Sequence, residues 1–146
     1  MSTGNRLDPE KTADALHAAA IHLLRRLRRT DVASGLNAPR LSALSVIVFS
    51  GPLTLGQLAD AEQVRPPTMT RIVHALESKG LVKKSADADD RRTIQISATM
   101  KGQRLLLKAR HRRVASLARQ IGILPAADSE TLHAAIGVIE NLLRAL

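Results

Sequence analysis

Apolar residues recur every three or four positions near the start of the chain, which is the spacing of one face of an α-helix. This pattern extends over Asp8–Asp31, with Pro9 in the first turn, where proline is tolerated. A second helix is expected over Pro39–Ser50, because Gly51-Pro52 follows it as a stop signal. The first third of the chain is therefore predicted to be helical.

A strong local signal for a helix start follows at Thr54. Its hydroxyl can accept from the backbone N–H of Gln57, whose side-chain oxygen can accept from the backbone N–H of Thr54. Leu53 and Leu58 occupy the two positions of a hydrophobic staple around this cap. A short helix is therefore predicted over Leu55–Ala61.

A turn, another short helix and a β-hairpin are predicted next. The helix covers Pro66–Lys79 and is closed by Gly80, since proline suits a first turn and glycine the position after the last. Segments 81–85 and 93–97 have the alternation and residue types of strands, and the Asp-rich segment 86–90 predicts the turn between them. Helix, turn, helix and hairpin within about 45 residues is typical of a winged helix-turn-helix.

Two longer helices are predicted for the rest of the chain. Thr99 can cap a helix over Met100–Ile121, and a last helix covers Pro125–Leu146. The predicted fold class is mainly α with a small β-hairpin wing. The first and last helices have apolar stripes that the small central module cannot bury, so they are expected to pair with a second copy of the chain.

The chain is accordingly divided into three parts. Residues 1–36 are predicted to form an N-terminal dimerisation arm, residues 37–100 the winged helix-turn-helix module, and residues 101–146 the C-terminal dimerisation helices. A twofold dimer would place two recognition helices one DNA turn apart, about 34 Å, and would read a pseudo-palindromic site on double-stranded DNA.

The charge of the chain favours a polyanionic partner. Lys and Arg number 22 against 13 Asp and Glu, so the formal net charge is +9. Polar and basic residues gather on the second short helix and the hairpin, and those proposed to bind DNA are Arg65, Thr68, Thr70, Arg71, His74, Lys83, Lys84, Arg91 and Arg92. The arginines of segment 25–29 are interpreted mainly as a solvated face, with a supporting phosphate contact as the alternative.

Composition excludes several classes of function. The absence of cysteine excludes disulfides, thiolate metal sites and thiol chemistry. No metal-ligand spacing, nucleophile elbow or phosphate-binding glycine loop is present, so no metal, cofactor or catalytic residue is predicted. The longest apolar run, 46–49, is far shorter than the roughly 20 residues of a membrane span, and a cytoplasmic protein without a membrane partner is expected.

Several motifs in the middle of the chain, taken in order, resemble the multiple-antibiotic-resistance regulator (MarR) family. They are Leu58-Ala59, Pro67-Thr68-Met69-Thr70-Arg71, Leu76-Glu77-Ser78-Lys79-Gly80-Leu81-Val82, Asp90-Arg91-Arg92, and Thr99 with Gly102. The order of elements extends the resemblance over nearly the whole chain.

Three positions depart from the family pattern. Gln63 stands in place of a turn glycine, and a positive φ there would add strain of about 1 kcal/mol. Arg65-Pro66 replaces the usual serine and arginine, which removes a cap and changes one DNA contact. Ala98 replaces a common leucine beneath the wing.

The resemblance also implies roles for individual residues. Arg92 would enter the minor groove, oriented by an ion pair with Asp90. Thr68, Thr70 and Arg71 would lie in or beside the major groove. Arg65 and His74 would flank them.

The resemblance further implies a homodimeric transcriptional regulator, here a repressor released by a small, anionic, aromatic ligand between the dimer arms and the DNA-binding module. The residues expected to line this ligand site are His22, Arg25, Leu44, Val48 and Phe49, within a wider apolar face over 41–48. An activator of the same architecture, a regulator without a ligand response, and a winged-helix module that docks a protein partner are the alternatives.

Overall fold

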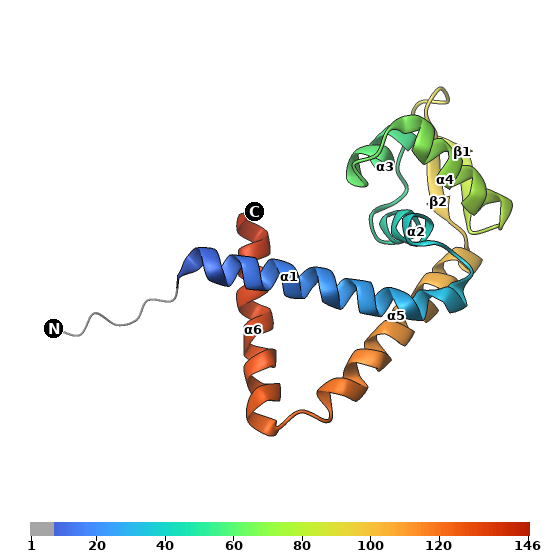
Figure 1. Ribbon diagram of the computed structural model, residues 1–146. Helices are drawn as coiled ribbons and strands as arrows, with labels where there is room; N and C mark the ends of the chain where they lie inside the picture. Colours follow the sequence, from blue (N-terminus) through green and yellow to red (C-terminus); the bar gives the residue numbers. More distant parts are fainter. Residues whose placement is uncertain (1–7) are drawn as a thin grey trace.

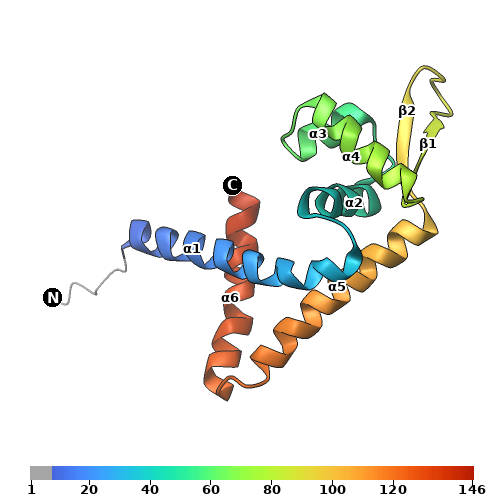
Figure 2. The same cartoon turned by 45° about the vertical axis from the view of Figure 1, so that its right-hand side comes forward.

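The computed structural model describes residues 8–146, and its elements follow the predicted order (Figure 1). The shorter helices in the middle of the chain and the hairpin form a lobe, and longer helices extend away from it (Figures 1 and 2). The elements are α1 (Pro9–Leu27), the 3-10 helix η1 (Arg28–Ser34), α2 (Ala38–Ser50), α3 (Leu55–Ala61), α4 (Pro66–Ser78), β1 (Val82–Ala86), β2 (Ile94–Ala98), α5 (Met100–Ile121) and α6 (Ala126–Ala145). The mainly helical fold with a hairpin wing is confirmed. The first seven residues of the predicted arm 1–36 lie outside the described residues.

The core of the lobe is aliphatic, and every element of the lobe contributes to it. Met69, Val73 and Leu76 of α4 are fully buried in one cluster with Ile96 of β2. The backbone of Ile96 exchanges two hydrogen bonds with that of Leu53, at 3.1 and 2.8 Å. The segment before α3 is therefore joined to the wing. The other buried apolar residues are Leu36, Leu41, Ala43, Leu44, Ile47, Leu53, Leu58, Ala59, Leu81, Val82, Leu106 and Ala109.

The predicted cap of α3 is confirmed. Thr54 Oγ1 accepts from the Gln57 N–H at 3.2 Å, and Gln57 Oε1 accepts from the Thr54 N–H at 2.9 Å. Leu53 and Leu58, the staple residues, are both buried. A sequence-local motif therefore fixes where α3 begins and how the chain enters it.

The wing strands begin and end one residue later than predicted. They are antiparallel, and Val82 pairs with Ala98. Leu81 belongs to the end of α4 instead, because its N–H donates to the Leu76 carbonyl at 3.0 Å while Gly80 adopts a φ of 70°. The glycine closure of α4 thus takes the first residue of the predicted strand.

The first helix does not continue in the α form through Asp31 as predicted. It changes at Leu27 to the tighter η1, where Thr30 Oγ1 donates to the Leu27 carbonyl at 2.7 Å. Gly35 then ends η1 with a φ of 72°. The change turns the chain from α1 toward α2 over residues 28–37.

The long helices leave much apolar surface uncovered. Among the described residues, α1 and α6 contain no buried residue at all. The division of the chain into arm, module and dimerisation helices stays a prediction.

No single helix within 8–146 is long and apolar enough to span a membrane. Only the pair Pro9–Ser34 and Ala38–Ser50, which is bent by 86°, reaches that length and apolarity when its two helices are taken together.

Candidate nucleic-acid interface and adjoining cavity

Helix α4 presents a polar face to solvent. Its buried residues, Met69, Val73 and Leu76, recur at intervals of three and four, so they share one side of the helix. The opposite side carries the exposed residues Thr68, Thr70, Arg71 and His74. Because the buried stripe holds the helix against the lobe, this exposed side is fixed in orientation and is available to a partner.

The turn that leads into α4 is strained, as expected from Gln63 in the place of the family's turn glycine. Gln63 has a φ of 53°, in the left-handed region that a side chain disfavours. Arg65 is the N-cap of α4 and makes no side-chain cap hydrogen bond, so the loss of the capping serine is confirmed. Its exposed guanidinium is instead placed at the start of the polar face.

The wing adds further basic side chains beside α4. Lys83 and Lys84 are exposed on β1, and Arg91 and Arg92 are exposed in the loop that joins the strands. Lys84 Nζ lies 3.3 Å from Glu77 Oε2 of α4. Within residues 8–146, Lys84 is the only one of these four side chains that forms an ion pair.

The ion pair predicted between Asp90 and Arg92 is not formed. Asp90 Oδ1 accepts from the backbone N–H of Arg92 at 2.9 Å, and Oδ2 accepts from Thr93 Oγ1 at 3.3 Å. An aspartate two residues before an N–H closes an Asx turn more readily than it reaches the following side chain. Asp90 therefore shapes the wing tip through the backbone.

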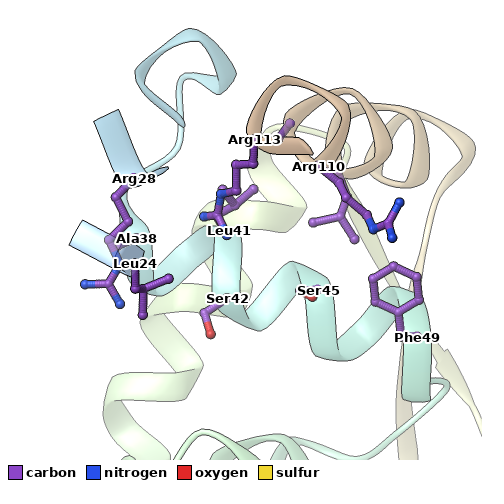
Figure 3. A pocket seen from close by; sticks show the side chains of 11 residues that line it. Leu24, Arg28, Ala38, Leu41, Ser42, Ser45, Phe49, Arg110 and Arg113 are labelled. Carbon is purple, nitrogen blue, oxygen red and sulfur yellow. The ribbon is translucent and has the colours of Figure 1, made fainter. Parts of the chain in front are cut away.

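A cavity of about 380 Å³ lies where α1, α2 and α5 meet (Figure 3). Its apolar lining includes Leu24, Leu41 and Phe49, and α5 adds Arg110, which lies near the Phe49 ring in Figure 3. The other lining residues are Arg28, Ala38, Ser42, Ser45, Leu106, Ala109 and Arg113. The cavity is therefore lined by three guanidiniums, by apolar side chains and by two serine hydroxyls.

One of the three guanidiniums is held by a buried acid that the sequence did not single out. Arg113 Nε donates to Asp31 Oδ1 at 2.7 Å, and Nη2 donates to Oδ2. Asp31 is 5% exposed and is the one buried charged residue within 8–146. The hydrogen bond from Arg113 to Asp31 raises the pKa of Arg113, and the negative charge of Asp31 adds to this increase. Burial of Arg113 lowers its pKa, but by less than the increase. Arg113 is therefore held in its charged form.

The residues predicted to line the ligand site are only partly brought together. Phe49 lines the cavity, whereas Leu44 is a fully buried core residue and Val48 packs against the core. His22 and Arg25 are exposed on α1 and do not line this cavity. The helical phase explains the difference, because Leu24 with Arg28, and Leu41 with Ser45 and Phe49, recur every fourth residue on the cavity faces.

Comparison with known proteins places this architecture. The model of the MarR family matches residues 36–94. The HTH-type transcriptional regulator Mb0904 of Mycobacterium bovis is 33% identical over 125 residues, covering 86% of this chain and 87% of the relative. The chain belongs to the MarR family. The matching residues include the exposed face of α4 and most of the wing.

Solved structures share this fold. The transcriptional regulator Tm0710 of Thermotoga maritima superposes with a TM-score of 0.80 at 21% identity, covering 93% of this chain and 96% of that one. CouR of Rhodococcus jostii, solved with p-coumaroyl-CoA, gives a TM-score of 0.62 at 25% identity, covering 86% and 88%. This MarR-family chain is a DNA-binding, helix-turn-helix transcriptional regulator, a class of protein that is not enzymatic.

Proposed function

We propose that this regulator is a homodimer that inserts α4 into the major groove and the wing into an adjacent minor groove of a pseudo-palindromic operator. The observation that carries the proposal is the exposed polar side of α4, held in place by buried Met69, Val73 and Leu76. Thr70 Oγ1 donates to the Pro66 carbonyl at 2.9 Å and so turns its lone pairs outward as acceptors. Hydroxyls and guanidiniums on a helix of this kind suit both base edges and phosphates.

Individual residues take distinct parts in this proposal. Thr68, Thr70 and Arg71 read base edges or neighbouring phosphates, with Arg65 and His74 at the margins. On the wing, Arg92 enters the minor groove, where basic side chains are attracted by its negative potential. The wing residues that contact or position the backbone are Lys83, Lys84, Asp90 and Arg91.

The uncovered long helices support the dimer. Eleven large apolar residues of α1, the end of α5 and α6 are more than a third exposed in the single chain. Burying apolar surface of this extent is the main driving force of stable association. These residues are Leu16, Ile21, Leu23, Leu24, Val114, Ile121, Leu132, Ile136, Val138, Leu142 and Leu143.

The cavity is the proposed site of a small ligand with an apolar body and an anionic group. Arg28 and Arg110 form no ion pair within residues 8–146, so they are suited to receive a carboxylate or a similar anion. Leu24, Leu41 and Phe49 supply the apolar contact. That CouR was solved with p-coumaroyl-CoA supports a ligand of this general type.

Ligand binding is proposed to release DNA, which makes the protein a repressor. The lobe holds α4 and the wing together, since both pack on one core. A ligand between arm and lobe would change the spacing of two recognition helices, and both half-sites must be met at once. Ligand-free protein is therefore the proposed DNA-binding form.

Two measurements test this proposal. Genomic DNA fragments retained by the purified protein are sequenced, and light scattering during gel filtration gives the mass in solution. We expect enrichment of one inverted-repeat sequence and a mass twice the 15.7 kDa of the chain. A monomer, or binding that random competitor DNA removes as well as the enriched fragment does, contradicts the proposal and favours a protein-docking module.

A further inference from the structure

We propose that Asp31 competes with the anionic group of the cavity ligand for Arg113, so that ligand binding loosens η1 from α5. This inference rests on the ligand site proposed above. It assigns to Asp31 a positioning role, exerted through Arg113, that the family resemblance does not imply.

The pair joins two segments that are distant in sequence. Asp31 lies on η1, and Arg113 lies 82 residues later on α5. The carboxylate and the guanidinium meet through two hydrogen bonds, the geometry in which arginine binds a carboxylate most strongly. Asp31 is the only buried residue of η1, and its two hydrogen bonds to Arg113 are the side-chain hydrogen bonds that join η1 to α5.

Arg113 also faces the cavity. Its side chain is 31% exposed, whereas that of Asp31 is 7% exposed, so a ligand can approach the arginine but not the acid. An anion drawn in by Arg28 and Arg110 would meet Arg113 as a third cation on the same wall. Two anions at one guanidinium repel each other, so the ligand and Asp31 compete for Arg113.

Loosening η1 has a path to the DNA-binding surface. η1 packs mainly on α5, and it leads within a few residues into α2, which contacts α4. A second, open hollow of about 610 Å³ borders the η1–α5 contact and leaves space for movement. Residues that line it include Arg29, Thr30 and Val32 of η1 and Arg112, Ala115 and Arg119 of α5.

The test uses two fluorescent probes with the full chain. One is 1-anilinonaphthalene-8-sulfonate, which is anionic, and the other is N-phenyl-1-naphthylamine, which has the same rings without the sulfonate. In Asp31→Asn we expect the anionic probe to bind about five-fold or more tightly than in the wild type, with the neutral probe unchanged within about two-fold. A structural role alone would weaken both probes together.

Glu62→Gln is the matched control. Glu62 Oε1 accepts from Ser42 Oγ at 3.0 Å, and Ser42 lines the cavity, so this variant removes a nearby negative charge that does not hold Arg113. We expect less than about a two-fold gain for the anionic probe in Glu62→Gln, since the charge that is lost is half-buried, still partly screened by solvent, and does not hold Arg113. Equal gains in Glu62→Gln and Asp31→Asn would mean that the anionic probe responds only to the overall electrostatic potential of the cavity, and would overturn the inference.

Two further measurements separate the ways in which the idea can fail. Arg110→Ala must weaken the anionic probe, and an unchanged affinity there overturns the proposed ligand site together with this inference. In the wild type, hydrogen exchange of residues 28–34 should quicken with the anionic probe and not with the neutral one. This second measurement does not depend on the folding of Asp31→Asn, and unchanged exchange overturns the loosening of η1 even where the cavity binds the probe.

Discussion

Lys84 of the wing lies 3.3 Å from Glu77 of α4, so an ion pair links the two elements that are proposed to contact DNA. Both side chains are 39% exposed, and such a pair stabilises the fold by at most about 1 kcal/mol. Its greater effect is on charge, because Glu77 offsets Lys84 while the Arg92 guanidinium forms no ion pair within residues 8–146. The two wing cations should therefore differ in their contribution to DNA binding.

Arg92→Ala is expected to weaken operator binding and to flatten its salt dependence. Loss of one phosphate or groove contact lowers the slope of log K against log salt by about one. Fluorescence anisotropy with labelled operator across a series of salt concentrations measures both quantities. Lys84→Ala, with its charge already offset, should change the slope less, and an unaltered slope in Arg92→Ala would refute the wing assignment.

Gln63→Gly is expected to stabilise the protein. Gln63 holds a φ of 53°, and relief of a side chain from this region stabilises the fold by about 0.5–1 kcal/mol after the entropy of glycine is counted. Urea unfolding followed by circular dichroism measures the change. Gln103→Gly, on an exposed turn of α5, should instead lower the free energy of unfolding by up to about 1 kcal/mol.

Gly102→Ala is expected to destabilise the lobe strongly. A Cβ at this position would stand 2.0 Å from the Leu81 carbonyl oxygen and 3.3 Å from a Leu44 methyl group. Relief of the clash must move backbone, at a cost of about 3 kcal/mol or more. Gly56→Ala, whose Cβ would meet nothing nearer than 3.9 Å, serves as the control, and a thermal scan that ranks the two variants equally would contradict the prediction.

Ile136→Asp is expected to produce a folded monomer that no longer binds operator. Ile136 is 49% exposed on α6, so a charge there costs the single chain little but would be buried in the proposed dimer. Light scattering gives the mass, and circular dichroism confirms the helix content. Asn141→Asp adds the same charge at an exposed polar position of α6 and should leave the dimer intact.

The features predicted correctly from the sequence are those whose cause lies within a few residues. Thr54 and Gln57 cap each other three residues apart, and Gly80 closes α4 through its own φ. Asp31 and Arg113 meet across 82 residues, and no local pattern marks either one in a chain with 22 basic residues. That contact depends on tertiary packing, which the sequence pattern does not specify.

The predicted ligand-lining residues lie on α1 and α2, two of the helices that border the cavity, but only some of them face it, and α5 was not among the predicted elements. α2 was expected to supply lining residues, and Phe49 does so, yet Leu44 points into the core. Both faces of α2 are apolar, so hydrophobicity alone does not distinguish the face toward the lobe from the face toward the cavity. Ser42 and Ser45 were the available signal, because hydroxyls are disfavoured in an aliphatic core.

Thr99 begins α5 with its hydroxyl on the Gly80 carbonyl, at 2.6 Å, and its N–H on that of Leu81, at 3.0 Å. One end of α5 is thus bonded to the closing turn of α4. The helix has 22 residues, which at about 1.5 Å per residue makes it about 33 Å long. Because α5 is about 33 Å long and is attached to the lobe at its first residues, a tilt of about 5° about that end moves its last residues by about 3 Å. In the proposed dimer, contacts between the far tips of the two α5 helices would convert small rotations of these helices into changes in the distance between the two copies of α4.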